Sequence, residues 1–199
     1  MASPTPDLIK RVLDHRVRQT LANPNLMPAA VMLLLYPKDG EYCVLLNKRS
    51  QQVEHHKGEM SFPGGARDPQ DRNSLDTALR ETEEEMGICR SDVTVLGRLD
   101  DVPTRSNFGV RVYVGAIPYP YPFNPSPLEV AEVVEIPISA LRNAANLRYD
   151  TRWVNGQAVN ACSYAYNEHL VYGATARILQ QFLELLEDGL NQEGDRIEQ

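Results

Sequence analysis

The sequence predicts one α/β domain with mixed strands and with helices near its start, middle and end. Apolar residues recur at helical spacing in three separate segments, and short apolar or alternating runs bounded by turn residues lie between them. The chain has 199 residues, 42% of them hydrophobic, which is enough for one sizeable core. Because no repeat and no domain boundary is visible, residues 1–199 are expected to form a single domain with its core at about 28–187.

The first elements are a helix and a hairpin. A helix is expected at residues 5–21, and a break marked by prolines follows it. The continuous apolar run 29–36 predicts a buried strand, and the letters KDGE predict a turn into a second strand at 42–49. The apolar positions that define the helix are Leu8, Ile9, Val12, Leu13, Val17 and Leu21.

The middle of the chain predicts a second helix and two strands. After the segment 50–73, a helix is expected at 74–86, with Gly87 as its C-cap. Alternating runs at 93–99 and 110–117 predict strands. The proline-rich stretch 118–127 is expected to be a surface loop.

The last third predicts further strands and a long helix. Residues 129–141 are expected to form a strand that runs into a short helix after Pro137. Asn155-Gly156 is a hairpin-turn dipeptide between two strand-like runs. An apolar stripe predicts a helix at 173–187, and the polar tail 191–199 is expected to be frayed.

The composition restricts the class of partner. The net charge of −7 and the pI of about 5.1 argue against a nucleic-acid partner. No apolar run approaches the roughly 20 residues that span a bilayer, so no membrane association is expected. The chain start lacks the apolar core of a secretory signal. The three cysteines, Cys43, Cys89 and Cys162, are widely spaced and are interpreted as small buried hydrophobes in a reducing compartment. These features predict a cytoplasmic protein.

The stretch TALRETEEEMG (77–87) concentrates four glutamates in one helix. At helical spacing Glu81, Glu84 and Glu85 lie within roughly 100° of one another, whereas Glu83 points to the other side. On a third face, the core stripe of this helix is expected to consist of Leu75, Leu79 and Met86. A solvated acidic face is the simpler interpretation. Three carboxylates that converge from one helix also suit a hard divalent cation such as Mg²⁺. The upstream pair Gly64-Gly65, some fifteen residues before Arg80, favours the second interpretation, because glycine lets a ligand approach the backbone.

The segment GGARDPQDRNSLDTALRETEEEMGI resembles the Nudix box, in which a glycine and a spaced acid precede R-E-U-x-E-E-x-G-U, where U is apolar. Thr82 stands where an apolar residue is usual. Eight residues separate Asp71 from Arg80 instead of seven, so we expect an insertion that a loop absorbs before the helix begins near Ser74 or Leu75. The matching residues are Arg80, Glu81, Glu84, Glu85, Gly87 and Ile88.

A second segment, LLNKRSQQVEHHKGEMSFPGG (45–65), resembles the motif of the coenzyme A pyrophosphatase branch, L-L-T-x-R-S-x-x-x-R-x-x-x-G-x-x-x-F-P-G-G. Asn47 replaces the threonine, and Glu54 replaces an arginine. Residues 164–179 resemble the end of that branch, so the resemblance covers roughly residues 28–183.

The resemblance implies a Nudix-type α/β/α sandwich with a mixed sheet and a diphosphatase dependent on Mg²⁺ or Mn²⁺. The implied substrate is a small nucleotide, foremost coenzyme A or acyl-coenzyme A, giving adenosine 3′,5′-bisphosphate and 4′-phosphopantetheine. Glu54 favours the alternative of another dinucleotide or nucleotide-sugar diphosphate, such as NADH or ADP-ribose. A non-catalytic nucleotide-binding regulator is disfavoured, because such modules usually lose box glutamates.

The resemblance also assigns roles. Glu81, Glu84 and Glu85, with the Gly65 carbonyl, are expected to bind the metal, and Arg80 is expected to orient the glutamates. The glycine loop is expected to approach the substrate. Either Glu129 or Glu132 is a candidate for a further carboxylate. The candidates for substrate binding are Arg49, Gly64, Gly65 and Arg67, with Lys57 as a weaker one. The oligomeric state stays open, a homodimer included.

Overall fold

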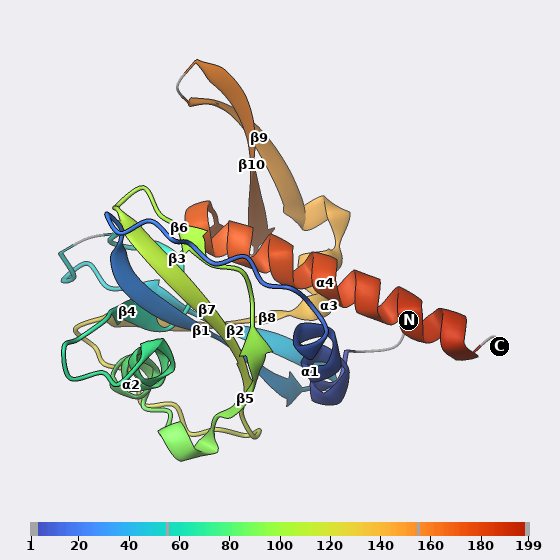
Figure 1. Cartoon of the computed structure of the whole chain (residues 1–199). Coiled ribbons are helices and arrows are strands. Elements are labelled where there is room, and N and C mark those ends of the chain that lie inside the picture. Colours follow the sequence, from blue (N-terminus) through green and yellow to red (C-terminus); the bar gives the residue numbers. More distant parts are fainter. Residues whose placement is uncertain (1–3, 55, 155, 198–199) are drawn as a thin grey trace.

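The fold is a mixed β-sheet with helices on both faces (Figure 1). The computed structural model describes residues 4–54, 56–154 and 156–197. Its α-helices are α1 (Pro6–Asp14), α2 (Ser74–Met86), α3 (Ile138–Arg142) and α4 (Gly173–Ile197), and two 3₁₀ turns are η1 (Arg90–Asp92) and η2 (Ala144–Asn146). Its strands are β1 (Met27–Lys38), β2 (Glu41–Arg49), β3 (Met60–Ser61), β4 (Gly64–Ala66), β5 (Thr94–Arg98), β6 (Val102–Pro103), β7 (Phe108–Ala116), β8 (Val130–Pro137), β9 (Leu147–Val154), β10 (Gln157–Tyr166) and β11 (His169–Val171).

The main sheet is built around β1, which pairs in parallel with β7 and antiparallel with β2. Strand β8 pairs with the other side of β2, and β5 and β6 pair with β7. At one end of the sheet β4 pairs with residues 29–31 of β1, and β3 pairs with residues 47–48 of β2. Residues 60–66 therefore lie between the diverging ends of β1 and β2, which places the glycine pair inside the sheet.

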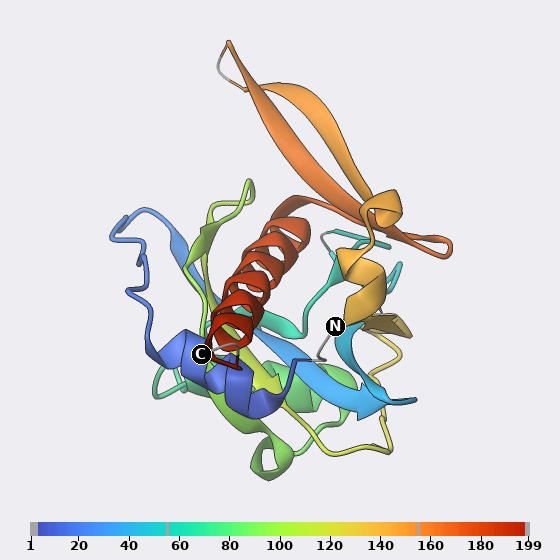
Figure 2. The ribbon, with the colours of Figure 1, turned by 90° about the vertical axis from the view of Figure 1, so that its right-hand side faces the viewer.

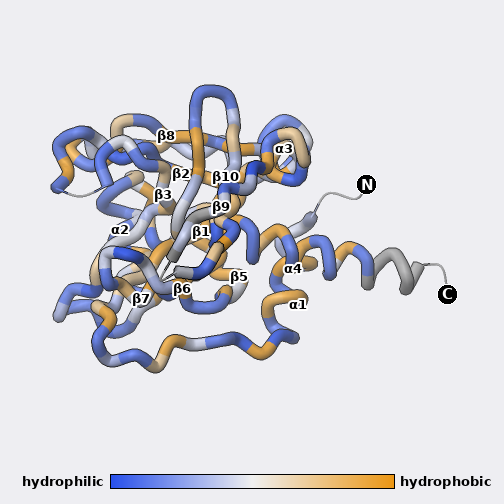
Figure 3. The backbone as a smooth tube through the Cα atoms, turned by 90° about the horizontal axis from the view of Figure 1, so that it is seen from above, coloured by the Kyte–Doolittle hydropathy of each residue, from blue (hydrophilic) through white to orange (hydrophobic). Residues whose placement is uncertain are grey.

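Two apolar cores hold the layers together. One contains Ile9 of α1 and Phe182 of α4 with inward-facing side chains of the sheet. The other contains Ala78 and Met86 of α2 with side chains of the opposite sheet face. Along α4, hydrophobic and hydrophilic segments alternate, as expected for a helix with one face on the core (Figure 3). The expected α/β/α sandwich is confirmed.

The prediction of a first helix at 5–21 is wrong in its length, because α1 ends at Asp14. The residues beyond it bond to the turn that follows β5. Arg16 Nη2 donates to Asp100 Oδ1 at 2.7 Å, and the backbone N–H groups of Gln19 and Leu21 donate to the carboxylates of Asp100 and Asp101. These tertiary bonds outweigh the helical spacing of the remaining apolar side chains.

Helix α2 has the predicted bounds, and both of its ends are capped. The Asn73 side chain accepts from the backbone N–H of Asp76, and Gly87 takes the left-handed conformation with φ 69°. The proline-rich loop adds two bonds, since the N–H groups of Asn124 and Ser126 donate to the carbonyls of Met86 and Glu85. The start at Ser74 confirms that a loop absorbs the extra residue.

The apolar side of α2 differs in detail from the predicted stripe. Met86 is fully buried, whereas Leu75 and Leu79 are only half-buried against the same core. Ala78 and Thr82 are fully buried. The hydroxyl of Thr82 donates to the Ala78 carbonyl at 2.7 Å, which satisfies this polar group at a position where the family pattern has an apolar residue.

The last third follows the prediction except at its end. Strand β8 runs into α3 directly after Pro137, as expected. The hairpin β9–β10 projects from the body (Figures 1 and 2); of its predicted turn, Gly156 has φ 78°, and Asn155 lies outside the described residues. The frayed tail is not observed up to Ile197, because α4 continues that far. Gly189 lies against Val12 of α1, so the helix still has a packing partner there.

Two further expectations concern cysteines and membranes. Cys43 and Cys162 are buried, but Cys89 is exposed, so the expectation of three buried cysteines fails at this position. Among the described residues, no helix has the length and apolar character needed to cross a bilayer.

Candidate active site

The box glutamates of α2 face the glycine pair of β4 and the end of β2. Glu85 is 3% exposed, and the side chain of Glu81 is 15% exposed. The side chain of Glu84 is 56% exposed. The cluster therefore extends from a buried carboxyl group to a solvated one.

Glu85 is held by groups from two strands. Its Oε2 accepts from Asn47 Nδ2 at 2.8 Å and from the Gly64 N–H at 3.2 Å. Its Oε1 lies 3.7 Å from Arg49 Nη1. The pKa of Glu85 is raised to about 8, mainly by burial and also by the charge of Glu81, against the opposing effects of Arg49 and the Gly64 N–H.

Glu81 lies directly against the backbone of the glycine pair. A Cβ atom added at Gly65 would lie 2.5 Å from Glu81 Oε1, so a side chain at this position and the observed carboxylate exclude each other. Burial raises the pKa of Glu81, while the contact with Arg80 lowers it. Gly65 thus leaves room for a carboxylate beside the main chain.

Arg80 connects the helix to the inserted loop. Its Nε and Nη2 donate to the two carboxylate oxygens of Asp71 at 2.9 and 3.1 Å, which is a bidentate pair. Its Nη1 lies 2.9 Å from an oxygen of Glu81 and 2.9 Å from an oxygen of Glu84. Arg80 also keeps the pKa of the buried Asp71 carboxyl well below its usual range. Arg80 thus contacts two glutamates of the cluster and the loop residue Asp71.

Glu83 points away from this cluster, as the helical spacing predicts. It is exposed, and its Oε2 accepts from Arg90 Nε at 2.9 Å. Glu83 therefore serves as a control position on the same helix.

Of the two candidates for a further carboxylate, the fold brings Glu129 to the cluster. The Glu129 charge raises the pKa of both Glu81 and Glu85. Its backbone carbonyl accepts from the Ser50 N–H at 2.8 Å, which fixes this segment beside β2. Glu132 instead contacts Lys48 and His169. Asn47, which contacts α2, pairs with Val133 in the β2–β8 register, and the next residue, Lys48, pairs with Glu132. Because successive strand residues point to opposite faces, Glu132 lies on the sheet face opposite α2.

The cationic candidates have different surroundings. Arg49 is near Glu85, at the end of β2. Arg67 is exposed, and its Nη2 donates to the carbonyls of Asp71 and Arg72 at 3.1 and 3.3 Å, which fixes the inserted loop. Lys57 is exposed in the loop between β2 and β3. Arg49 is therefore the candidate closest to the carboxylates.

Sequence reasoning missed the support of Glu85 by Asn47. Asn47 is 1% exposed; its Oδ1 accepts from Ser61 Oγ while its Nδ2 donates to Glu85. The residue had been singled out only as a departure from the family motif. The available signal was weak: Asn47 directly follows the apolar run of β2 and is itself buried, and a buried amide needs partners.

We predict that Glu85→Gln changes how the stability of the metal-free protein depends on pH. Below the ordinary pKa of 4.5 the carboxyl is protonated in both the folded and the unfolded chain. Above it the unfolded chain loses the proton first, so stability falls until the folded pKa of about 8 is passed. The Glu85→Gln variant does not lose stability in this way, because its side chain carries no titrating proton. Its free energy of unfolding, measured by urea denaturation, should therefore rise relative to wild type across this range. A difference that is constant with pH would contradict the prediction.

Alanine at the two glycines should separate stability from activity. At Gly64, with φ 155°, an added Cβ would lie 2.4 Å from the Ala30 carbonyl oxygen, so Gly64→Ala should cost about 1–3 kcal/mol of stability. At Gly65 the clash is with the carboxylate end of a side chain, that of Glu81, and not with the backbone. Gly65→Ala should thus stay within about 0.5 kcal/mol of wild type yet lose activity about tenfold or more. Thermal melts and hydrolysis assays measure both, and full activity of Gly65→Ala would refute the role of this contact.

Comparisons with known proteins match this chain to one family. A family model described as NUDIX domain matches residues 26–153. The protein named Nudix hydrolase NudL of Photorhabdus laumondii is 35% identical over 156 residues, which cover 78% of this chain and 83% of that protein. The protein of the same name from Yersinia pestis is 34% identical over 184 residues, 91% of this chain and 87% of that protein.

A crystal structure of a MutT/nudix family protein from Enterococcus faecalis has a similar fold. Its TM-score is 0.54 at 16% identity, over 93% of this chain and 70% of that chain. The family model covers more than half of the chain, and the sequence relatives match most of it. This protein therefore belongs to the Nudix hydrolase family.

Proposed function

We propose that this Nudix hydrolase cleaves the diphosphate linkage of coenzyme A or acyl-coenzyme A, giving adenosine 3′,5′-bisphosphate and 4′-phosphopantetheine. One observation carries the proposal: three residues of the coenzyme A-type segment, Asn47, Arg49 and Gly64, contact Glu85 of the Nudix helix. The second motif and the box therefore form one site. This supports a role for the second motif in the reaction.

The chemistry of the donor set fits a hard divalent cation. Glu81, Glu84 and Glu85 offer carboxylate oxygens, the Gly65 carbonyl is a further candidate, and oxygen ligands are what Mg²⁺ and Mn²⁺ prefer. Nη1 of Arg80 now lies between Glu81 and Glu84. These residues would hold the cation if Arg80 kept its pair with Asp71 and gave up this nitrogen. When bound, the metal supplies charge neutralisation at the diphosphate and a lower pKa for a ligated water.

The chain's own residues have separate tasks. Arg49, at the end of β2, can donate to two phosphate oxygens in the bidentate geometry that guanidinium favours. Glu129 lies near Glu81 and Glu85 without being part of α2. We assign it the role of general base, which takes a proton from the attacking water. Asn47 holds Glu85 in position through its amide.

A second candidate substrate is a dinucleotide or nucleotide-sugar diphosphate that lacks the 3′-phosphate of coenzyme A. Backbone bonds join Arg49 to Glu59 and Gly58 to Arg49, which close the base of the loop between β2 and β3. Glu54 is exposed in this loop, where the family motif has arginine. At an exposed position, a glutamate in place of an arginine changes the interaction with a phosphate by about 1 kcal/mol or less. The charge therefore favours, without enforcing, substrates without the additional phosphate.

Removing a carboxylate from the cluster should abolish most activity. Glu85→Gln and Glu84→Gln should each lower kcat/KM roughly a hundredfold or more with Mg²⁺, because several kcal/mol of charge stabilisation are lost. Glu83→Gln is the matched control on the same helix and should stay within about twofold. Hydrolysis assays with melting curves of each variant measure both effects. Full activity of Glu85→Gln with unchanged metal dependence would refute the metal-binding assignment.

The charge at position 54 should tune substrate choice. Glu54→Arg should raise kcat/KM for coenzyme A more than for 3′-dephospho-coenzyme A, because only the first carries the extra phosphate. Asp188→Arg makes the same change in net charge at an exposed position of α4 and should leave the ratio unchanged. If wild type already prefers coenzyme A by about tenfold or more, equivalent to about 1.4 kcal/mol, Glu54 does not set the preference.

A further inference from the structure

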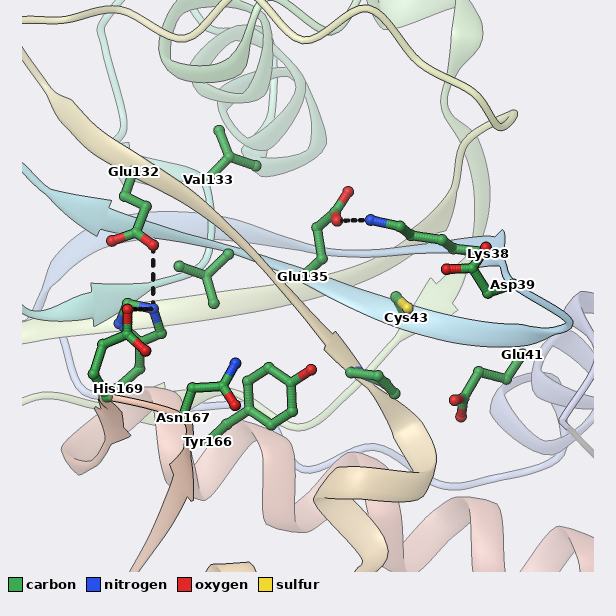
Figure 4. Close-up of a pocket in the computed structure, with 13 residues that line it drawn as sticks. Lys38, Asp39, Glu41, Cys43, Glu132, Val133, Glu135, Tyr166, Asn167 and His169 are labelled. Atoms are coloured by element: carbon green, nitrogen blue, oxygen red, sulfur yellow. Dashed lines mark hydrogen bonds and ion pairs between the residues drawn. The ribbon is translucent and has the colours of Figure 1, made fainter.

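A second group of metal-ligating side chains lies on the sheet face opposite α2. Glu132, Glu168 and His169 each offer a ligand atom, and these three atoms lie within 4.8 Å of one another. His169 Nε2 is 3.2 Å from Glu132 Oε1 and 3.9 Å from Glu168 Oε1. Figure 4 shows the Glu132 and His169 side chains pointing toward one another. The group is separate from the glutamates of the Nudix box.

The fold brings these residues together from two sheets. Glu132 is on β8, at the edge of the main sheet. Glu168 and His169 lie at the turn between β10 and β11, where Tyr166 pairs with His169 and Asn167 has φ 51°. His169 is 7% exposed, so its imidazole has a fixed position, whereas the Glu168 side chain is 75% exposed and can move.

The surroundings are acidic. The three residues line a pocket of about 340 Å³, whose lining also includes the carboxylates of Asp39, Glu41 and Glu135. Lys38 is the one lysine of this lining, and it is paired with Glu135. A pocket with this excess of negative charge attracts cations.

From this geometry we propose that Glu132, Glu168 and His169 form a binding site for a first-row transition-metal ion such as Zn²⁺. Ligands of tetrahedral zinc lie about 3.3 Å apart, because the metal–ligand bonds are about 2.0–2.1 Å long. The separation between His169 and Glu132 already matches this value. The mobile Glu168 has to approach by roughly half an ångström to complete a three-residue set.

The ligand types distinguish this site from the one on α2. An imidazole nitrogen favours zinc over Mg²⁺, which prefers oxygen ligands only. Lys48 Nζ lies 3.7 Å from the other oxygen of Glu132, where it can orient that carboxylate without blocking Oε1. A bound ion would fasten the β10–β11 turn, just before α4, to the edge of the main sheet. Its effect is therefore on stability and not on the hydrolytic site.

The test is zinc binding to tag-free full-length protein by equilibrium dialysis, with Mg²⁺ in excess. Glu168→Gln removes an exposed ligand, and His169→Gln removes the buried one. Glu41→Gln is the matched control, since it removes a carboxylate of the same pocket outside the group. Thermal melts with and without zinc provide a second readout, and hydrolysis of Mg²⁺-loaded protein is measured in parallel.

We expect Glu168→Gln and His169→Gln each to weaken one zinc site by about tenfold or more and to abolish the zinc-dependent rise in melting temperature. Glu41→Gln should retain both, and Mg²⁺-supported hydrolysis by Glu168→Gln should be unchanged. Equal zinc binding by wild type and Glu168→Gln would overturn the proposal, and so would an equal loss in Glu41→Gln. Because Glu168→Gln changes an exposed side chain, a folding failure of His169→Gln leaves the test decisive.

Discussion

The structure depends on keeping the carboxyl group of Glu85 almost out of solvent beside a second carboxylate. Removing such a group from water is costly unless it is protonated, hydrogen-bonded or paired. All three occur here: the pKa is raised, Asn47 and Gly64 donate to one oxygen, and Arg49 lies near the other. Buried carboxyl groups with a strongly raised pKa and a specific charged partner cluster at functional sites.

The rest of the scaffold positions the groups around that carboxyl. Residues 60–66 lie between β1 and β2 and so bring the glycine pair under α2. The Asp71–Arg80 pair keeps a guanidinium beside Glu81 and Glu84. The loop after β7 caps the C-terminal end of α2 and then leads to Glu129, which the Ser50 N–H holds next to β2. Segments far apart in sequence thus converge on one helix face.

The sequence predicted the periodic features and missed those that depend on tertiary contacts. The bounds of α2, the solvent-facing Glu83 and the loop around Asp71 followed from helical spacing and motif length. Helix α1 was predicted too long, because spacing cannot reveal that Asp100 and Asp101 bond the backbone of residues 19 and 21. Likewise the side on which Glu132 lies depends on the β2–β8 register, and the Asn47–Glu85 bond depends on how β2 and α2 pack.

The most direct measurement is the number of protons released when Mg²⁺ binds, from titration calorimetry at pH 7 in buffers of different ionisation enthalpy. Metal ligands must be deprotonated, and the Glu85 carboxyl, with its pKa raised to about 8, is mostly protonated at this pH. The account predicts release of close to one proton per bound ion by wild type, and none by Glu85→Gln. Binding of Mg²⁺ to wild type without proton release would contradict the claim that the buried carboxyl of Glu85 is the group on which the site is built.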